Sequence, residues 1–217
     1  MINHHISDES LLDFASGALG EAWSIAVASH LTFCTQCRDR LSEMEALGGL
    51  LLSSIDPVSG GMNDSFEAIR GRLDEGKKLK SNVSKVKRAS NLFPQPLAHY
   101  IGNDLNGLDW RRLGLKAHQI IVKTSDESAT ARLLKIQEGE PIPEHSHDGL
   151  EMTLVISGAY SDVSGRYGRG DFQEADEEIE HRPVVEMGEE CICLTVTNAP
   201  LRFSNLTTRI VQPILGV

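Results

Sequence analysis

The chain has 217 residues, 8 histidines, 4 cysteines and a formal net charge of −10. This length favours one or two domains. It contains no apolar run near the roughly 20 residues that cross a bilayer, and no signal-peptide pattern near its start. We therefore expect a cytoplasmic protein with no membrane partner. Because cytoplasmic thiols stay reduced, the cysteines indicate metal or redox groups rather than disulfides.

The charges are unevenly distributed along the chain. Residues 1–76 hold 12 acids and 4 bases, residues 77–98 hold 6 bases and no acid, and residues 99–217 hold 19 acids and 11 bases. Two acidic regions joined by a basic segment are not typical of a protein that binds nucleic acid directly. An acidic surface suits a basic protein partner, although it can equally serve only to keep the chain soluble.

The first 76 residues predict a small all-α domain. Ser7 is a suitable N-cap for a first helix, which Gly17 and Gly20 end. A second helix is expected over residues 21–31 and a third over about 35–53. An apolar stripe predicts how the third helix packs, and it consists of Cys37, Leu41, Met44, Leu47 and Leu51.

A fourth helix is expected over about residues 66–73. Its apolar residues are few, and Phe66, Ile69 and Leu73 lie at helical spacing. Such a stripe can pack on the core of its own domain, or it can bind a partner protein as a detachable helix. The pattern does not separate the two alternatives.

The stretch from His30 to Cys37 carries the strongest signal in this half of the chain. His30, Cys34 and Cys37 lie close enough in sequence to direct an imidazole and two sulfurs into one small space. Structural zinc prefers these ligands in a closed, four-coordinate site. His5 is our choice for the fourth ligand, with His4 as the alternative. The competing interpretation is a reduced cysteine pair without a metal.

The residue pattern of the sequence changes from the basic segment onward. Residues 77–98 predict an extended linker, because they are basic and end in two prolines. Residues 99–217 then contain short strand-like runs separated by glycine, proline and acidic turns, which predicts an all-β barrel or sandwich. The expected runs are residues 119–123, 131–136, 151–156, 191–196 and 201–203.

A second group of metal-ligand residues lies within this all-β region. His145 and His147 alternate along one strand and so face the same side, and Glu151 can return to that side after a short bend. His181 would come from the facing strands. Imidazoles and a carboxylate on one face make a site for a transition metal. The competing interpretation is a pair of surface histidines.

These motifs resemble known families. Residues 139–158 match the first cupin motif, G-x5-H-x-H-x3-E-x6-G, and residues 167–171 resemble the turn of the second motif with glycine in place of proline. The His-x3-Cys-x2-Cys pattern with an earlier histidine is similar to the zinc-binding anti-sigma family. The two domains in this order, over essentially the whole chain, resemble the ChrR-type anti-sigma factors.

The resemblance implies a function. In that family the zinc domain binds an extracytoplasmic-function-type sigma factor and blocks its access to RNA polymerase, and the cupin domain is needed for release under singlet oxygen or organic hydroperoxide stress. Carried over by motif, His5, His30, Cys34 and Cys37 would hold zinc. A second divalent metal, expected to be zinc, would be held by His145, His147, Glu151 and His181.

Other interpretations stay open at this stage. The chain could be a cupin dioxygenase or isomerase with an appended zinc domain, since cupin sites often bind iron. A DNA-binding zinc finger is disfavoured, because the spacing of the ligands is wrong and the domain is acidic. Cys191 and Cys193 share one face of a strand. They can be ordinary core residues or redox groups near the cupin metal.

Overall fold

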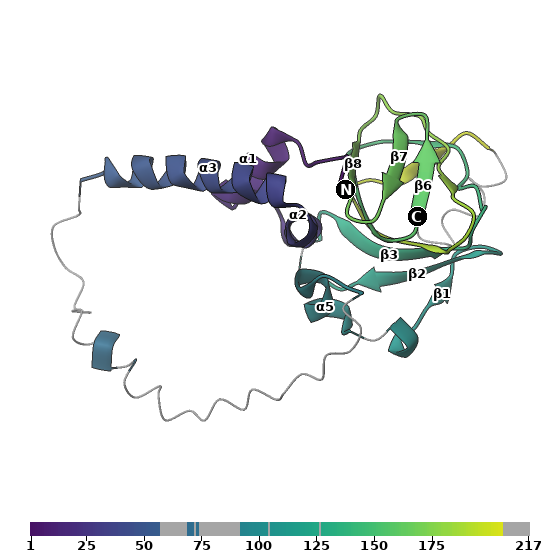
Figure 1. Cartoon of the computed structure of the whole chain (residues 1–217), viewed down its shortest axis with the longest axis horizontal. Coiled ribbons are helices and arrows are strands. Elements are labelled where there is room, and N and C mark those ends of the chain that lie inside the picture. The colour runs from purple at the N-terminus through teal and green to yellow at the C-terminus, as the bar shows by residue number, and fades with distance from the viewer. Residues whose placement is uncertain (57–68, 72, 74–91, 104, 126, 206–217) are drawn as a thin grey trace.

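The computed structural model describes residues 1–56, 69–71, 73, 92–103, 105–125 and 127–205. The helical elements come first in the chain and the strands follow (Figure 1). The helices are α1 (Asp8–Ser16), α2 (Glu21–Phe33), α3 (Thr35–Ser53), α5 (Gln95–Ile101) and the short 3₁₀ helix η1 (Leu105–Gly107). A helical region followed by a cupin-like β region is the predicted fold, and it is confirmed.

The start and end of α1 follow from its capping residues. The Ser7 hydroxyl accepts a hydrogen bond from the Ser10 N–H at 3.2 Å, as an N-cap does. Gly17 ends the helix in the left-handed conformation, at φ 73°. Both capping residues stand where the sequence predicts them.

The strands form three antiparallel sheets. The largest has the order β1-β2-β3-β10-β5-β8, and two smaller sheets have the orders β11-β4 and β7-β6-β9. The strands are β1 (Arg111–Arg112), β2 (Ala117–Val122), β3 (Thr130–Ile136), β4 (His145–His147), β5 (Glu151–Ser157), β6 (Ala159–Asp162), β7 (Gly165–Gly168), β8 (Phe172–Ala175), β9 (Val184–Val185), β10 (Cys191–Thr197) and β11 (Leu201–Phe203). The five strand-like runs of the sequence correspond to β2, β3, β5, β10 and β11.

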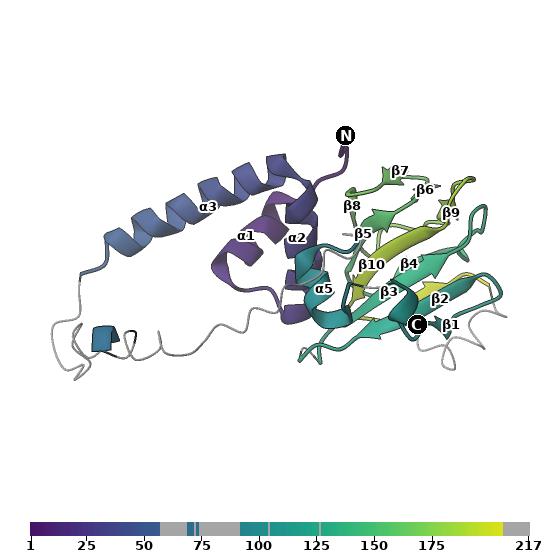
Figure 2. The same ribbon diagram turned by 60° about the horizontal axis from the view of Figure 1, so that its bottom comes forward.

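The helical region packs directly on one face of the large sheet (Figure 2). Along β5, Met152, Leu154 and Ile156 are fully buried and belong to the same core cluster as Ala26 and Val27 of α2. Glu151 and Thr153 alternate with them and face the opposite side. The central strands are therefore covered on both faces, and the two regions share one hydrophobic core.

Helix α2 is apolar around most of its circumference because it lies in the middle of this core. Its buried side chains face α1 and α3 on one side and the sheet and α5 on the other. A helix with only one apolar stripe could not fill this position. The buried residues of α2 are Ala22, Trp23, Ile25, Ala26, Val27, Ser29, His30 and Leu31.

The expected packing of α3 is wrong in its second half. Leu41 and Met44 pack against the core as predicted, whereas Leu47 and Leu51 are 56% and 62% exposed. The physical reason is the length of α3, which has 19 residues against the 9 of α1. Its C-terminal half extends beyond the other helices (Figure 1), so the apolar stripe continues without a surface to pack on.

Two further predictions fall partly outside the described residues. Phe66 and residues 77–91 of the expected linker lie outside them. Residues 69–71 and 73 are helical, and Ile69 and Leu73 are exposed rather than packed on a core. At the end of the expected linker, Phe93, Leu97 and Ala98 are buried, and α5 packs against α2.

No single described helix is both long and apolar enough to cross a membrane. Taken together, α1 and α2 pass the test of length and composition, but they are bent by 113° relative to each other.

The shared core makes a prediction for stability. The change Leu154→Ala would remove a fully buried side chain between α2 and the sheet. We expect it to lower the free energy of unfolding by about 2–5 kcal/mol, measured by urea titration with circular dichroism. The matched change Leu50→Ala, at a residue that is 70% exposed on α3, should cost less than about 0.5 kcal/mol. Equal effects at the two positions would contradict a shared core.

Two candidate metal centres

The first centre joins the N-terminal segment to the α2–α3 junction. The Nδ1 atom of His5 lies 3.2 Å from the Cys34 sulfur and 3.6 Å from the Cys37 sulfur. The Nε2 atom of His30 lies 3.3 Å from the Cys37 sulfur. All four ligand atoms lie within 4.8 Å of one another. Three of the four residues are buried, so the donor atoms converge in a space closed to solvent.

The environment of the histidines fixes which nitrogen faces the centre. The Nδ1 atom of His30 lies 2.9 Å from the Gly170 carbonyl oxygen, so it must donate a proton, and Nε2 presents its lone pair to the cysteines. This arrangement is typical of metal-ligating histidines. His4, the alternative ligand, lies elsewhere: its Nε2 atom is 3.0 Å from the Arg166 carbonyl oxygen, and its ring packs on Tyr167.

Burial determines the charge of this centre. It lowers the pKa of His30 to about 4, so the imidazole is neutral at pH 7. It also raises the pKa of the Cys37 thiol to about 11. A neutral imidazole is ready to bind a metal, whereas the thiol must lose its proton when a metal enters. Metal binding at this centre is therefore expected to release protons.

The second centre lies on the inner face of the β region. His145 and His147 come from β4, Glu151 begins β5, and His181 forms an isolated bridge with His145. The Nε2 atom of His181 lies 3.0 Å from that of His145 and 3.3 Å from that of His147. A Glu151 carboxylate oxygen lies 3.9 Å from the Nδ1 atom of His147. All four residues are buried.

The Nε2 atoms of His145 and His181 face each other at the centre of this site. The Nδ1 atom of His145 donates to the Pro143 carbonyl oxygen at 2.7 Å, and that of His181 donates to the Asp162 carboxylate at 2.8 Å. Burial lowers the pKa of His145 to about 4, so at neutral pH its Nε2 atom is a lone pair that faces the Nε2 atom of His181 at 3.0 Å. Three imidazoles and one carboxylate that converge in a buried space are ligands that suit a transition metal, so the residues fit a metal.

Burial and hydrogen bonding also affect the other two ligand candidates, His147 and Glu151. Burial lowers the pKa of His147 to about 4 and raises the pKa of Glu151. The Thr153 hydroxyl donates to the Glu151 carboxylate at 3.1 Å, which fixes the carboxylate toward the histidines.

Sequence reasoning missed Asp162, which orients His181. Its carboxylate also accepts a hydrogen bond from the Gln173 side chain at 2.9 Å. Burial acts to raise the pKa of Asp162, but the hydrogen bonds from His181 and Gln173 lower it overall. A lone aspartate at the end of a short strand carries no spacing signal, so only the folded arrangement shows its role.

The turn of the second cupin-like motif holds the N-terminal segment. The backbone N–H groups of Asn3 and His4 donate to one oxygen of the Asp171 carboxylate at 2.6 and 3.0 Å. The Gly168 N–H donates to the other oxygen at 2.8 Å. Gly170 has φ +89°, and a Cβ atom there would lie 3.0 Å from the Ile2 side chain. Glycine is thus required by both the backbone conformation and the close approach of the N-terminal segment.

Cys191 and Cys193 are buried thiols on β10. A hydrogen bond with Cys191, together with burial, raises the pKa of Cys193 well above its usual value. The thiolate is the nucleophilic form of cysteine, so Cys193 is protonated and poorly reactive at neutral pH. This favours the interpretation as core residues.

Comparison with known proteins identifies the family. A family model described as the ChrR cupin-like domain matches residues 101–201. The anti-sigma-E factor ChrR of Cereibacter sphaeroides is 42% identical over 216 residues, which cover 100% of this chain and 99% of the relative. The chain belongs to the ChrR family of anti-sigma factors.

A solved structure supports the same assignment. The crystal structure of Rhodobacter sphaeroides SigE in complex with the anti-sigma ChrR contains a chain that is 41% identical to this one. The two superpose with a TM-score of 0.80, over 91% of this chain and 99% of the other. Membership of a family of anti-sigma factors confirms the prediction of a non-enzymatic regulator, and the cupin-enzyme alternative is set aside.

The geometry of the second centre leads to a prediction about metal affinity. The change Asp162→Asn keeps the size of the side chain but removes the carboxylate that orients His181. We expect it to weaken metal binding at the second centre roughly 10- to 100-fold, measured by competition with a chromophoric chelator. Asp148→Asn is the control, because Asp148 is half exposed and pairs with Arg202. Equal affinities for the two variants would contradict the role assigned to Asp162.

Proposed function

We propose that this ChrR-family protein binds an extracytoplasmic-function-type sigma factor, keeps it from RNA polymerase, and releases it under oxidative stress. The similarity over the whole chain to an anti-sigma factor, including one solved in complex with its sigma factor, carries the proposal. We place the protein in the cytoplasm, where its thiols stay reduced. Residues 1–76 are the proposed sigma-binding unit, residues 77–98 the linker and residues 99–217 the sensing unit.

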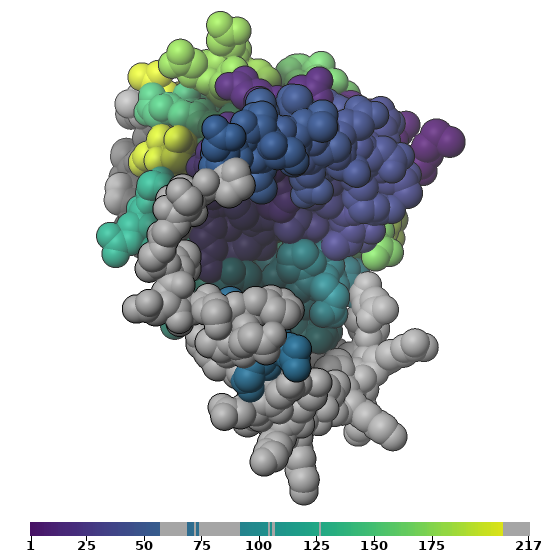
Figure 3. All heavy atoms as spheres, turned by 90° about the vertical axis from the view of Figure 1, so that its left-hand side faces the viewer, coloured from purple at the N-terminus to yellow at the C-terminus, as the bar shows by residue number. Residues whose placement is uncertain are grey.

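An exposed apolar surface supports binding through the helical region. We call it the α3 leucine surface, and it consists of Leu47, Leu50, Leu51, Leu52 and Ile55. Each of these side chains is more than half exposed, and α3 lies on the surface that faces the viewer in Figure 3. Contiguous exposed apolar side chains are typical of a protein-binding site.

The residues of the expected fourth helix extend this proposal. Ile69 is 46% and Leu73 66% exposed, so neither is needed by the core of the chain. We retain both, together with Phe66, as proposed partner-binding residues. The exposure of Ile69 and Leu73 favours the detachable helix over one that packs on the core of its own domain.

The first centre is proposed to hold a structural zinc ion. Two thiolates and two imidazoles are the donor set that zinc prefers, and His5, His30, Cys34 and Cys37 supply it. Because the set joins the N-terminal segment to the α2–α3 junction, zinc would stabilise the position of α3 relative to α1 and α2. The α3 leucine surface then depends on this ion for its orientation.

The second centre is proposed to hold a divalent metal, with zinc as our choice. His145, His147, Glu151 and His181 are its ligands. We propose this centre as the first sensor, because a tightly held zinc protects the thiolates of the first centre from oxidation. Loss of one ligand from a four-ligand site would shift its geometry, and β5 links Glu151 directly to the face that packs against α2.

The sigma-binding proposal predicts the effect of a charge on the α3 leucine surface. The change Leu51→Glu would bury an unpaired charge in the complex. We expect the dissociation constant for the sigma factor encoded in the same genome to rise at least roughly 30-fold, which corresponds to about 2 kcal/mol. The measurement is surface plasmon resonance with the purified full-length chain.

The matched control is Val163→Glu. Val163 is 80% exposed and lies outside α3, in the turn between β6 and β7. This variant should bind as tightly as the wild type. If Leu51→Glu binds equally well while remaining folded by circular dichroism, α3 is not part of the interface.

The sensing proposal is tested separately. The double change His145→Ala and His147→Ala removes two ligands of the second centre and leaves the first centre intact. We expect the variant to bind the sigma factor but to lose release after exposure to singlet oxygen or an organic hydroperoxide, measured as expression from a sigma-dependent promoter in cells. Normal induction in the variant would exclude the second centre as the sensor.

A further inference from the structure

Residues 2–7, which we call the N-terminal strap, lie between the first metal centre and the β region. The Nδ1 atom of His5 is 3.2 Å from the Cys34 sulfur and 3.6 Å from the Cys37 sulfur. The next residue, Ile6, is 1% exposed and belongs to the same core cluster as both cysteines. The strap therefore forms part of the cover over the two thiols, which are themselves buried.

The β region holds this strap on the N-terminal side of His5. One oxygen of the buried Asp171 carboxylate accepts the backbone N–H groups of Asn3 and His4, at 2.6 and 3.0 Å. The other oxygen accepts the Gly168 N–H at 2.8 Å. Detachment of the strap would remove two of these three donors from a buried charge. Because a buried charge without hydrogen-bond partners is costly, Asp171 favours the attached position.

The strap also runs along the edge of the large sheet. Strand β8 is the last strand of that sheet, and its Phe172 N–H donates to the His4 carbonyl oxygen at 3.2 Å. On the other side of His5, the Ser7 N–H and hydroxyl each donate to the Glu174 carboxylate at 3.2 Å. An edge strand presents backbone groups that a neighbouring segment can pair with. His5 is thus fixed between two attachments to β8.

The helical region holds the other end of the strap. The Arg40 guanidinium donates to the Ile6 carbonyl oxygen at 3.0 Å and pairs with the Asp8 carboxylate. If the contact with Asp171 opened, residues 2–5 could move away from the thiols while Ile6 stayed on the helical region. Access to the thiols then depends on a side chain of the β region.

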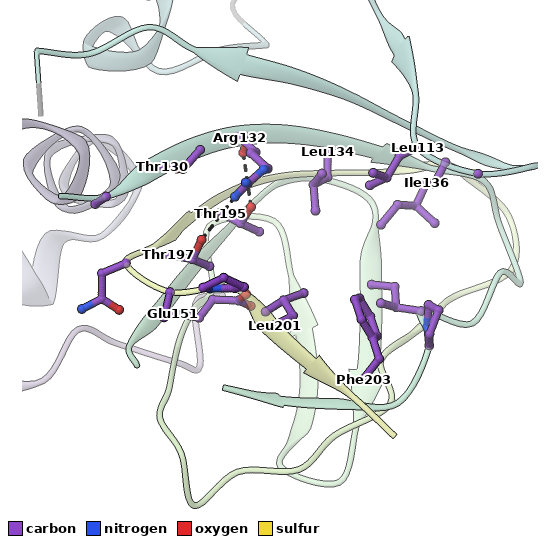
Figure 4. Close-up of a pocket in the computed structure, with 18 of the residues that line it drawn as sticks. Leu113, Thr130, Arg132, Leu134, Ile136, Glu151, Thr195, Thr197, Leu201 and Phe203 are labelled. Atoms are coloured by element: carbon purple, nitrogen blue, oxygen red, sulfur yellow. Dashed lines mark hydrogen bonds between the residues drawn. The ribbon is translucent and has the colours of Figure 1, made fainter. Parts of the chain in front are cut away.

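Strand β8 also lies next to the second centre. Ala175, at the C-terminal end of β8, pairs with Glu151 of β5. The Glu151 side chain lines a cavity of about 550 Å³ on the inner face of the large sheet (Figure 4). One short strand therefore contacts both the strap and a ligand candidate of the second centre.

We propose that the N-terminal strap is a removable cover over the Cys34 and Cys37 thiols, and that Asp171 keeps it closed. Asp171 is a positioning residue, because it acts through the backbone of Asn3 and His4 rather than on the thiols. Through this contact the β region controls solvent access to the first centre, with or without a bound metal. This role is independent of sigma-factor binding, and it is tested on the purified chain alone.

The test compares Asp171→Ala with the wild type by iodoacetamide labelling of the full-length, reduced protein, followed by mass spectrometry of its peptides. We expect labelling of Cys34 to become at least roughly ten-fold faster, because two hydrogen bonds to a charged acceptor are lost. Labelling of Cys191 and Cys193, buried on β10, should keep the wild-type rate. Each protein is labelled as purified and again after treatment with a chelator, so that a difference in bound metal does not determine the result.

The matched control is Asp176→Ala. Asp176 is exposed directly after β8 and accepts the Glu178 N–H at 3.1 Å, so its carboxylate also holds a turn, but within its own loop. This variant should label Cys34 at the wild-type rate. Selective exposure of Cys34 in Asp171→Ala is a result that a general loss of stability would not give, because unfolding exposes all four cysteines.

Hydrogen exchange measured by mass spectrometry gives an independent readout of the same opening. In Asp171→Ala, the amides of Asn3 and His4 should exchange at least roughly ten-fold faster than in the wild type, and those of β10 should not change. Faster exchange throughout the chain would contradict a local cover.

A second variant keeps the test decisive if Asp171→Ala fails to fold. Glu174→Ala removes only the attachment at Ser7, and it should accelerate labelling of Cys34 at least roughly three-fold. If labelling of Cys34 in the folded variants stays at the rate of Asp176→Ala, or rises only together with that of Cys191 and Cys193, the strap is not the cover and the proposal is wrong.

Discussion

The structure depends on the packing of α2 against β3, β5 and β10. This single contact covers the large sheet on one face and gives the short helices a core that they could not form among themselves. Leu154 and Leu194 on the sheet and Ala22 and Ala26 on α2 are completely buried. Because burial of apolar surface is the main favourable contribution to folding, the helical and β regions are expected to fold as one cooperative unit.

Both candidate metal centres are built around this contact. The first centre lies at the C-terminal end of α2, and its His30 donates to the carbonyl oxygen of Gly170 in the β region. The second centre lies on the other face of the sheet and takes Glu151 from β5. Each centre therefore has a ligand residue that is fixed by the interface between the regions. A change in either metal centre would therefore act on a strand or turn against which the helical region packs.

The predictable parts of the structure are those set by local sequence. Ser7 and Gly17 cap α1, and a short strand-like run between turn residues identifies β3, because in both cases the signal lies within a few residues. The members of each candidate metal centre could be proposed because few residue types bind metals well. The missed features depend on contacts between distant segments: Asp162 orients His181, and Asp171 captures the backbone of Asn3 and His4.

The exposed half of α3 shows a second limit of prediction from sequence. Periodicity predicts that Leu47 and Leu51 face an apolar surface, and it is correct about the pattern. It cannot tell whether that surface belongs to the chain itself or to a partner. Only the lengths of the neighbouring helices decide this, and α1 is too short to reach the end of α3. An apolar stripe that extends beyond the core of its own chain is therefore itself evidence for a binding partner.

The arrangement of sites on the sheet explains how distant events can be coupled. The second centre takes Glu151 from the inner face of β5, and α2 packs on the outer face of the same strand. A ligand or an oxidised metal site can favour the free form of a regulator only if it binds or stabilises that form more strongly than the bound form. Close-packed interiors transmit strain, so a shift of Glu151 on one face of β5 would be expected to reach Met152 and Leu154 on the other. The proposed coupling between the second centre and the helical region would then need no extended pathway, because β5 contributes to both.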